Sequence, residues 1–209
     1  MTFEIEDTAQ EWPIVSSEDL AKGFVTTYRR DRVRMIDGDV GSREYTVHPG
    51  AVGAIVLDEQ DRVLVLRQYR HPVRRELWEL PAGLLDKPGE HPLEAAKREL
   101  YEEAHLQASH WRVLADYFNT AGSSDEAMRI FLARGVSAAD GERYVGRGEE
   151  AGLVLKWVAR DALLDAVLAG RVGTGSLVVG VLALTVALGR PGGLDALRSP
   201  DAPWPARPF

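Results

Sequence analysis

Hydrophobic and polar positions change period along the chain, and each change indicates a different kind of element. Apolar runs at residues 51–57 and 62–67, separated by four polar residues, predict two strands joined as a hairpin. From residue 93 to 104, apolar residues recur every three or four positions, which predicts a helix with one buried face. Further strands are expected at 111–117, 127–133 and 153–158, and further helices at 159–169 and 176–189. This order predicts an α+β fold with a mixed sheet flanked by helices.

The beginning of the chain is also rich in β-forming residues, including the segment 24–28. We expect one or two strands here, turned around Asp37-Gly38-Asp39 or Gly41, and another strand at 43–48. These strands predict a small antiparallel β appendage.

The chain of 209 residues is expected to have three parts. Residues 1–47 form the N-terminal β region, and residues 48–190 form the main domain. Residues 191–209 are rich in Pro and Gly, and they are expected to form an extended or mobile tail.

Composition excludes several classes of function. The chain has no cysteine, which excludes disulfides, a cysteine nucleophile and thiolate metal sites. Its net charge of −7 disfavours general nucleic-acid binding. The apolar stretch at 176–188 is too short to span a membrane, and the N-terminus lacks the basic and apolar regions of a secretory signal. We therefore expect a cytoplasmic protein without a nucleic-acid or membrane partner.

The predicted helix at 93–104 carries three glutamates on one flank. Glu102 lies three residues after Glu99, and Glu103 four residues after it. Like charges at this spacing repel, so the cluster needs a counter-charge, and Arg98 can pair with Glu102. Mg²⁺ prefers such oxygen ligands together with substrate phosphates, whereas the scattered histidines argue against zinc. Taken alone, a glutamate-rich face is more often a solvated surface.

The segment 82–106, AGLLDKPGEHPLEAAKRELYEEAHL, resembles the Nudix box, the signature of the Nudix hydrolases. The family pattern is G-x5-E-x7-R-E-U-x-E-E-x-G-U, with U aliphatic. Gly83 and Glu90 match its first two positions, and the R-E-U-x-E-E core is intact at 98–103. Two features depart from the pattern: six residues separate Gly83 from Glu90, and His105 replaces the last glycine. That glycine suits a left-handed helix C-cap, so we expect His105 to affect stability and not chemistry.

The resemblance implies an α/β/α sandwich of the Nudix type and a Mg²⁺-dependent hydrolase, with Mn²⁺ as a substitute. It implies that Glu99 and Glu103 are the leading metal ligands, that Glu102 assists, and that the main-chain carbonyl of Ala82 is a further ligand. Arg98 would orient the glutamates through charge-assisted hydrogen bonds. Glu102 and Arg98 are therefore expected to take part in catalysis.

Three further segments, YTVHPG (45–50), LRQYRHP (66–72) and LWELPAGL (77–84), are similar to the ADP-ribose pyrophosphatase branch. This resemblance implies hydrolysis of the diphosphate of ADP-ribose to AMP and ribose 5-phosphate by a metal-activated water. Arg70 falls where this branch contacts the diphosphate, and Arg67 could share that role. Glu79 is placed to bond substrate or to orient an arginine.

The branch also implies residues outside the Nudix box. A glutamate on a later mobile loop positions or deprotonates the water, and either Glu149 or Glu150 in GRGEEAG (146–152) matches it. Tyr28 or Tyr45 could stack on the adenine, as could Trp78. In similar enzymes the N-terminal strands pair with a second subunit, which implies a homodimer acting on a small nucleoside diphosphate.

Three other hypotheses remain open. One is the same chemistry on another nucleotide sugar or a dinucleotide. Another is a non-catalytic Nudix module that senses ADP-ribose-like ligands, although the intact R-E-U-x-E-E core argues against it. The third is a structural interaction protein with a glutamate-rich helix. Metal dependence separates the enzyme from the last hypothesis, and turnover separates it from the sensor.

Overall fold

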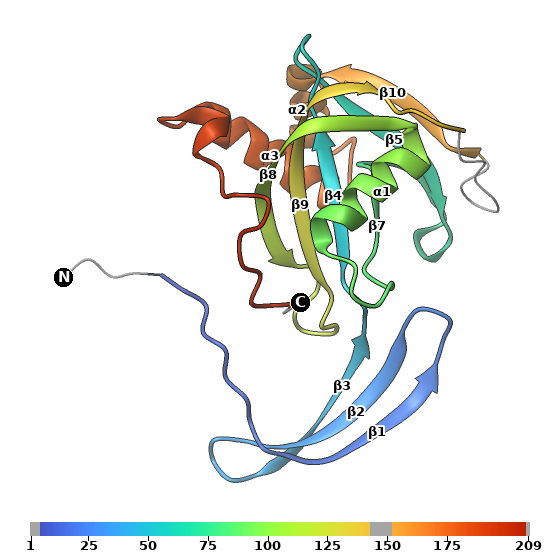
Figure 1. Cartoon of the computed structure of the whole chain (residues 1–209). Helices are drawn as coiled ribbons and strands as arrows, with labels where there is room; N and C mark the ends of the chain where they lie inside the picture. Colours follow the sequence, from blue (N-terminus) through green and yellow to red (C-terminus); the bar gives the residue numbers. More distant parts are fainter. Residues whose placement is uncertain (1–4, 143–151, 208–209) are drawn as a thin grey trace. The chain divides into compact units, whose positions relative to one another are not determined.

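The computed structural model describes residues 5–142 and 152–207, and the chain divides into two units (Figure 1). Unit 1 contains residues 1–48 and the loop 120–125. Unit 2 contains residues 49–119 and 126–209.

Unit 1 is an antiparallel sheet in the order β1-β2-β3, with β1 at Ile14–Lys22, β2 at Thr27–Arg34 and β3 at Val40–Val47. The predicted turn around Gly38 is confirmed: the Met35 N–H donates to the Asp39 carbonyl at 2.7 Å, and Gly38 has a φ of 92°. Most side chains of β1 are exposed. The main-chain ladder and cross-strand ion pairs, such as Arg29–Asp19 at 2.6 Å, therefore contribute more here than a core does.

The β-forming segment 24–28 is a strand only from Thr27 onward. The N–H of Gly23 donates to the carbonyl of Thr26 at 2.8 Å, which makes residues 23–26 the turn between β1 and β2. Phe24 in this turn is fully exposed. The β-forming residues of the turn do not extend the strand because β-propensity reflects burial on a pleated surface, and this turn provides no such surface.

Unit 2 contains two sheets, ordered β10-β5-β6 and β7-β4-β9-β8. Its strands are β4 (Ala51–Val56), β5 (Arg62–Arg70), β6 (Arg75–Glu79), β7 (Ala82–Leu84), β8 (Leu106–Phe118), β9 (Ala127–Ala138) and β10 (Val154–Ala159). Its helices are α1 (Pro92–Ala104), α2 (Arg160–Leu168) and α3 (Gly175–Leu188), with short 3-10 turns at His71–Val73 and Gly193–Ala196. Strands β4 and β9 are parallel and the other pairs are antiparallel, so the predicted α+β fold with a mixed sheet is confirmed.

Two apolar clusters lie on opposite faces of the four-stranded sheet. Successive side chains of a strand point to opposite faces, and β4 is buried along its whole length. Val52 and Ala54 pack in one cluster with α1, whereas Ile55 packs in the other cluster with α3. The two helices therefore cover the two faces of this sheet (Figure 1). Within the described residues, no helix combines the length and apolar character needed to cross a bilayer.

The predicted hairpin of residues 51–57 and 62–67 is wrong. Both strands exist, but β4 and β5 belong to different sheets. Near the connection they form an isolated bridge between Leu57 and Val63, and the Asp58 N–H donates to the Arg62 carbonyl at 3.0 Å. Each strand is apolar on both faces, so each needs packing layers on both sides. The two strands diverge into separate sheets because this arrangement supplies those layers.

The C-terminal segment is packed against unit 2, so the prediction of an extended or mobile tail is wrong. Its Trp204 is buried, and the Arg129 guanidinium lies 4.8 Å from the centre of that ring. Arg129 forms two hydrogen bonds of 2.8 Å with Asp116, and it also donates to the carbonyls of Ala202 and Pro203. A buried guanidinium must satisfy its donors, and this segment supplies two of the acceptors.

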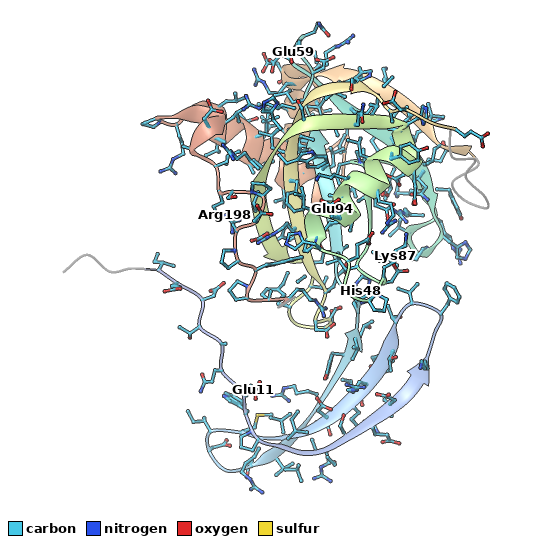
Figure 2. The ribbon with its side chains drawn as sticks, in the orientation of Figure 1. Glu11, His48, Glu59, Lys87, Glu94 and Arg198 are labelled. Atoms are coloured by element: carbon cyan, nitrogen blue, oxygen red, sulfur yellow. The ribbon has the colours of Figure 1, made fainter. Side chains whose placement is uncertain are left out.

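A second set of contacts holds the same segment along β8. The Val113 N–H donates to the Arg198 carbonyl at 3.0 Å, and the Arg198 guanidinium donates to Asp116 at 2.8 Å. Figure 2 labels Arg198 on this segment beside the sheet. Leu194 is buried in the α3 cluster. The segment therefore completes the core despite its Pro and Gly content.

Candidate active site

Helix α1 forms where its apolar period predicts, and its buried side holds Leu93, Ala96, Leu100 and Ala104. Pro92 occupies the first turn, where a missing N–H costs nothing. His91 caps the helix by accepting the Leu93 N–H at 3.3 Å on its Nδ1. Because this side is held in the core, the flank with the three glutamates faces away from it.

The helix ends in a left-handed residue, as the sequence predicts. His105 has a φ of 54° and a ψ of 41°, and its N–H is directed at the carbonyls of Leu100 and Tyr101. Its ring lies 5.4 Å from the Tyr101 ring, centre to centre. The ring Nδ1 is buried and has no hydrogen-bond partner among the described residues. His105 thus combines a strained backbone with an unsatisfied polar atom.

Replacing His105 by glycine is expected to raise the free energy of unfolding by about 0.5–1 kcal/mol, because glycine adopts this conformation without a steric cost. His105→Ala is the matched control, since it removes the ring but keeps the strained backbone. Urea unfolding measures both variants. A glycine variant no more stable than the alanine variant would contradict the backbone explanation.

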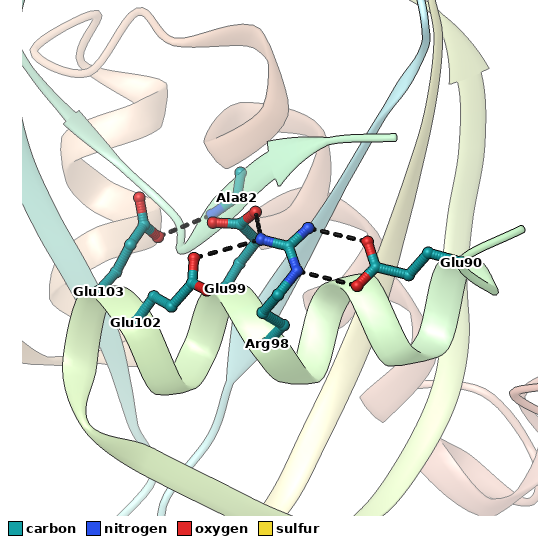
Figure 3. Close-up of polar contacts among 6 residues, drawn as sticks. All are labelled: Ala82, Glu90, Arg98, Glu99, Glu102 and Glu103. Atoms are coloured by element: carbon teal, nitrogen blue, oxygen red, sulfur yellow. Dashed lines mark hydrogen bonds and ion pairs between the residues drawn. The ribbon is translucent and has the colours of Figure 1, made fainter. Parts of the chain in front are cut away.

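Arg98 lies among three carboxylates in unit 2 (Figure 3). Its Nε and Nη2 each donate to Glu90 at 2.9 Å, and its Nη1 donates to Glu102 at 3.2 Å and also to Glu99. The predicted pairing of Arg98 with Glu102 is therefore present. These hydrogen bonds hold the pKa of Glu90 below its ordinary value, and they raise the pKa of Arg98. The extra residue before Glu90 does not prevent it from reaching this guanidinium.

Strand β7 brings its main chain against the glutamates. The Ala82 N–H donates to Oε2 of Glu103 at 3.0 Å. Ala82 and Gly83 pair with β4 as part of the short strand β7. A Cβ on Gly83 would overlap the carboxylate of Glu99. A side chain at this position would displace the carboxylate of Glu99, and glycine leaves it in place.

A second charged pair lies just before β7 in the chain. Arg70 at the end of β5 donates from Nε and Nη2 to the two oxygens of Glu79, at 2.8 and 2.6 Å. Glu79 is buried, whereas the Arg70 side chain is 42% exposed. Glu79 precedes Ala82 by three residues, so their Cα atoms lie within about 11 Å of each other. The expectation that Glu79 orients an arginine agrees with this geometry.

The other expected substrate residues make contacts of different kinds. The Arg67 guanidinium lies over the Trp78 ring at 5.6 Å and 3.7 Å from Glu76. In unit 1, the Tyr28 hydroxyl donates to Glu44 at 3.1 Å, and the Tyr45 hydroxyl donates to Asp31 at 2.8 Å. Trp78 packs partly buried against the core. The stacking roles of these rings therefore stay predictions.

The expected water-positioning residues cannot be placed. Glu149 and Glu150 lie outside the described residues. In the loop 120–125, Asp125 accepts the His48 N–H at 2.7 Å within unit 1.

The donor set of the carboxylate cluster suits a hard divalent cation. Three carboxylates, those of Glu90, Glu99 and Glu102, bond to the single guanidinium of Arg98, and Glu103 adds a fourth beside β7, so negative charge is in excess. All candidate donors are oxygens, including the Ala82 carbonyl, which matches the preference of Mg²⁺. Among the described residues, no three acidic or histidine side chains are already arranged as metal ligands. The hydrogen bond from the Ala82 N–H holds the Glu103 carboxylate beside β7.

Comparisons with known proteins agree with this geometry. The NUDIX domain model matches residues 47–174. An ADP-ribose pyrophosphatase of Mycobacterium tuberculosis is 41% identical over 192 residues, which cover 88% of this chain and 90% of that protein. An ADP-ribose pyrophosphatase of Bacillus subtilis is 30% identical over 135 residues, covering 65% and 72%.

A solved structure supports the fold. The crystal structure of an ADP compounds hydrolase superposes with a TM-score of 0.73 and 19% identity, covering 88% of this chain and 97% of that one. Three observations lead to the same assignment: the match to the family model, the 41% sequence identity over most of both chains, and the Nudix box on α1. This chain belongs to the Nudix family, and it is a Nudix hydrolase.

Proposed function

We propose that this protein hydrolyses the diphosphate of ADP-ribose to AMP and ribose 5-phosphate in a Mg²⁺-dependent reaction. The observation that carries the proposal is the grouping of Glu99, Glu102 and Glu103 on α1, beside strand β7. The 41% identity to an ADP-ribose pyrophosphatase over most of both chains supports the choice of substrate.

Glu99 and Glu103 would hold the metal, with Glu102 and the carbonyl of Ala82 assisting. Nudix hydrolases generally use divalent metal ions, and the oxygen donors here suit Mg²⁺, with Mn²⁺ as a substitute. When bound, the metal neutralises charge on the diphosphate and acidifies water. Arg98 contributes to catalysis by orienting the carboxylates, because its hydrogen bonds to Glu90, Glu99 and Glu102 offset their mutual repulsion.

Arg70 would hold the diphosphate. A guanidinium is a planar fork that matches phosphate oxygens, and Glu79 fixes the orientation of this one with two hydrogen bonds. Arg67 could share this contact from the same strand. Tyr28 and Tyr45 would contact the adenine. Removing the ring that stacks on the base would weaken the binding free energy of the substrate by about 1–3 kcal/mol.

In the proposed reaction, the oxygen of a water forms a bond to one phosphorus in line with the leaving oxygen. The bond between that phosphorus and the bridging oxygen breaks, and the bridging oxygen leaves with the other phosphate. Glu149 or Glu150 would orient the water and accept its proton. No covalent intermediate with the protein is needed.

Substituting Glu149 and Glu150 singly by glutamine is expected to lower kcat by about a hundredfold in one variant and little in the other, because a positioned base contributes at least this much. Steady-state kinetics with saturating Mg²⁺ measures both. If neither variant changes kcat, the water is deprotonated without these two residues.

The substrate is tested by incubating the purified protein with ADP-ribose, with and without Mg²⁺, and separating the products by chromatography. Mg²⁺-dependent formation of AMP and ribose 5-phosphate is expected. No cleavage would favour another nucleotide sugar or a dinucleotide, to be tested as a panel. Binding without cleavage of any of them would favour a sensor.

We also propose a homodimer formed through residues 1–47, acting in the cytoplasm on a small nucleoside diphosphate without a nucleic-acid or membrane partner. Exposed apolar side chains in unit 1, Ile14 and Val15 on β1 and Ile36 in the turn between β2 and β3, support this role. Light scattering of the full chain tests the oligomeric state. A monomer at micromolar concentration would contradict it.

A further inference from the structure

A cavity of about 360 Å³ lies beside β8 in unit 2. Its apolar wall is formed by Leu93 of α1, Trp111 of β8, Leu132 of β9 and Pro200 of the C-terminal segment. Ligand pockets are typically of this size or larger and mostly apolar, with a few polar groups that orient the ligand. The C-terminal segment therefore builds one wall of a cavity that the catalytic proposal does not use.

The polar groups around this cavity are mainly basic. The basic residues are Lys97 of α1, His110 and Arg112 of β8, and Arg134 of β9; Ser109 is neutral and Asp195 is the acidic member. His110 lies directly opposite Arg134 in the β8–β9 ladder, and Arg112 is two residues further along β8. Side chains two residues apart on a strand lie on the same face. The ladder thus places Arg112 and Arg134 on the α3 face of the sheet, in a protein of net charge −7. Trp111 lines the cavity from the other face, together with Leu93 and Lys97 of α1, so the cavity follows the edge strand β8.

Arg112 makes no ion pair with any residue that the structure describes, although it is partly buried at the cavity. The two other permanent cations have exposed partners: Arg134 pairs with Asp195 at 2.9 Å, and Lys97 pairs with Glu94 at 2.8 Å. Surface pairs of this kind contribute little, so an incoming anion can compete with the acidic partners. A guanidinium without an acid partner is the natural anchor for such an anion.

This cavity is separate from the carboxylate cluster. Strands β7 and β8 are the opposite edges of the four-stranded sheet, about 14 Å apart at the usual strand spacing. On α1, Lys97 and Glu99 are two residues apart, which is about 200° around the helix axis. One flank of α1 therefore carries the glutamates, and the opposite flank contributes Leu93 and Lys97 to the cavity.

We propose that this cavity is a second ligand site, which binds a nucleoside monophosphate. Arg112, with Arg134 on the same face, receives the phosphate as a charge-assisted contact. The apolar wall formed by Leu93, Trp111 and Pro200 receives the planar base. A phosphate without a base would use only the charged part of the site, so it should bind more weakly.

The test is titration calorimetry with AMP and with inorganic phosphate, on the full chain in EDTA. Wild type is compared with Arg112→Gln, with Arg70→Gln, which alters the candidate active site, and with Arg171→Gln, an exposed arginine outside this cavity. We expect Arg112→Gln to weaken AMP binding at least tenfold, whereas Arg70→Gln and Arg171→Gln leave it within twofold. Phosphate alone should bind wild type more weakly than AMP.

Absence of AMP binding to wild type would overturn the proposal, as would unchanged binding to Arg112→Gln. If only Arg70→Gln weakens AMP binding, AMP binds at the candidate active site. If Arg70→Gln and Arg112→Gln weaken AMP binding equally, the attraction is a non-specific effect of charge. Either result would overturn the proposal. Arg112→Gln should keep the turnover and Tm of wild type. Because binding is measured without metal or turnover, failure of the ADP-ribose assay would leave this site standing.

Discussion

Replacing Glu103 by glutamine is expected to reduce Mg²⁺-dependent turnover by about a thousandfold, comparable to losing a preorganised charge-stabilising group in other enzymes. The substitution removes the negative charge that a metal ligand needs, but almost no volume. Glutamine keeps a side-chain oxygen that can accept the Ala82 N–H, as Glu103 does at 3.0 Å. Stability should therefore change little, because like-charge repulsion with Glu99 is also relieved.

The matched control is Glu94→Gln on the same helix. Glu94 is exposed and pairs with Lys97, on the side of α1 away from Glu103. The turnover of the Glu94→Gln variant should equal that of wild type. Steady-state kinetics and circular dichroism on both variants separate loss of chemistry from loss of fold. A folded Glu103→Gln protein with near-normal activity would exclude Glu103 as a metal ligand.

Replacing Arg98 by glutamine is expected to lower the free energy of unfolding at pH 7 by about 2–3 kcal/mol, because removing one partner leaves the others unpaired. The side chain is 19% exposed and bonds to Glu90, Glu99 and Glu102. Without it, these carboxylates face one another uncompensated. Turnover should also fall by about a hundredfold, because the residues that orient metal ligands contribute this much.

The pH dependence of this loss follows from Glu90. Its pKa is held below the ordinary value of 4.5 by the hydrogen bonds from Arg98. When the pKa of a carboxyl group is lower in the folded protein than in the unfolded protein, its ionised form stabilises the fold. This stabilisation is complete at a pH above the unfolded-state pKa, and it is lost as the pH falls through the folded-state pKa. The stability difference between wild type and Arg98→Gln should therefore be largest above about pH 6 and should shrink below about pH 4.5.

Arg98→Lys serves as the control for charge alone. Lysine keeps the positive charge, but it cannot form the two parallel hydrogen bonds that Arg98 makes with Glu90. It should recover part of the stability. If Arg98→Lys recovers the full stability and turnover, the cluster needs only the positive charge and not the two parallel hydrogen bonds of the guanidinium. Urea unfolding between pH 3.5 and pH 8, with kinetics at pH 7, measures all three proteins.

The candidate site could be predicted largely because its parts are local. The spacing of Glu99, Glu102 and Glu103 follows from the helical period, and the apolar positions of the same segment decide which flank is buried. The left-handed conformation of His105 also follows from its place after the last helical turn. For Glu79, the expectation of a bonded arginine came from the family resemblance; the structure supplies Arg70 from the neighbouring strand β5.

The errors concern segments whose structure depends on distant partners. An apolar run such as residues 62–67 indicates a buried strand, but it does not specify the neighbouring strand, and β5 pairs with β6 and β10 instead of β4. The C-terminal segment has the composition of a tail, but Arg129 and Trp204 join it to β9. The close approach of Gly83 to the carboxylate of Glu99 joins β7 to α1, and it depends on how the strand and the helix pack.

The sequence by itself determined the helix, the positions of its charges, most strand locations and the Nudix signature, because each depends on residues within a few positions of one another. Only the tertiary structure decided which strands pair, that Arg98 also pairs with Glu90, and that the C-terminal segment helps to enclose a basic cavity beside β8. Those contacts join residues far apart in the chain. Their free energy depends on burial and charge satisfaction, which arise only when the whole core is assembled.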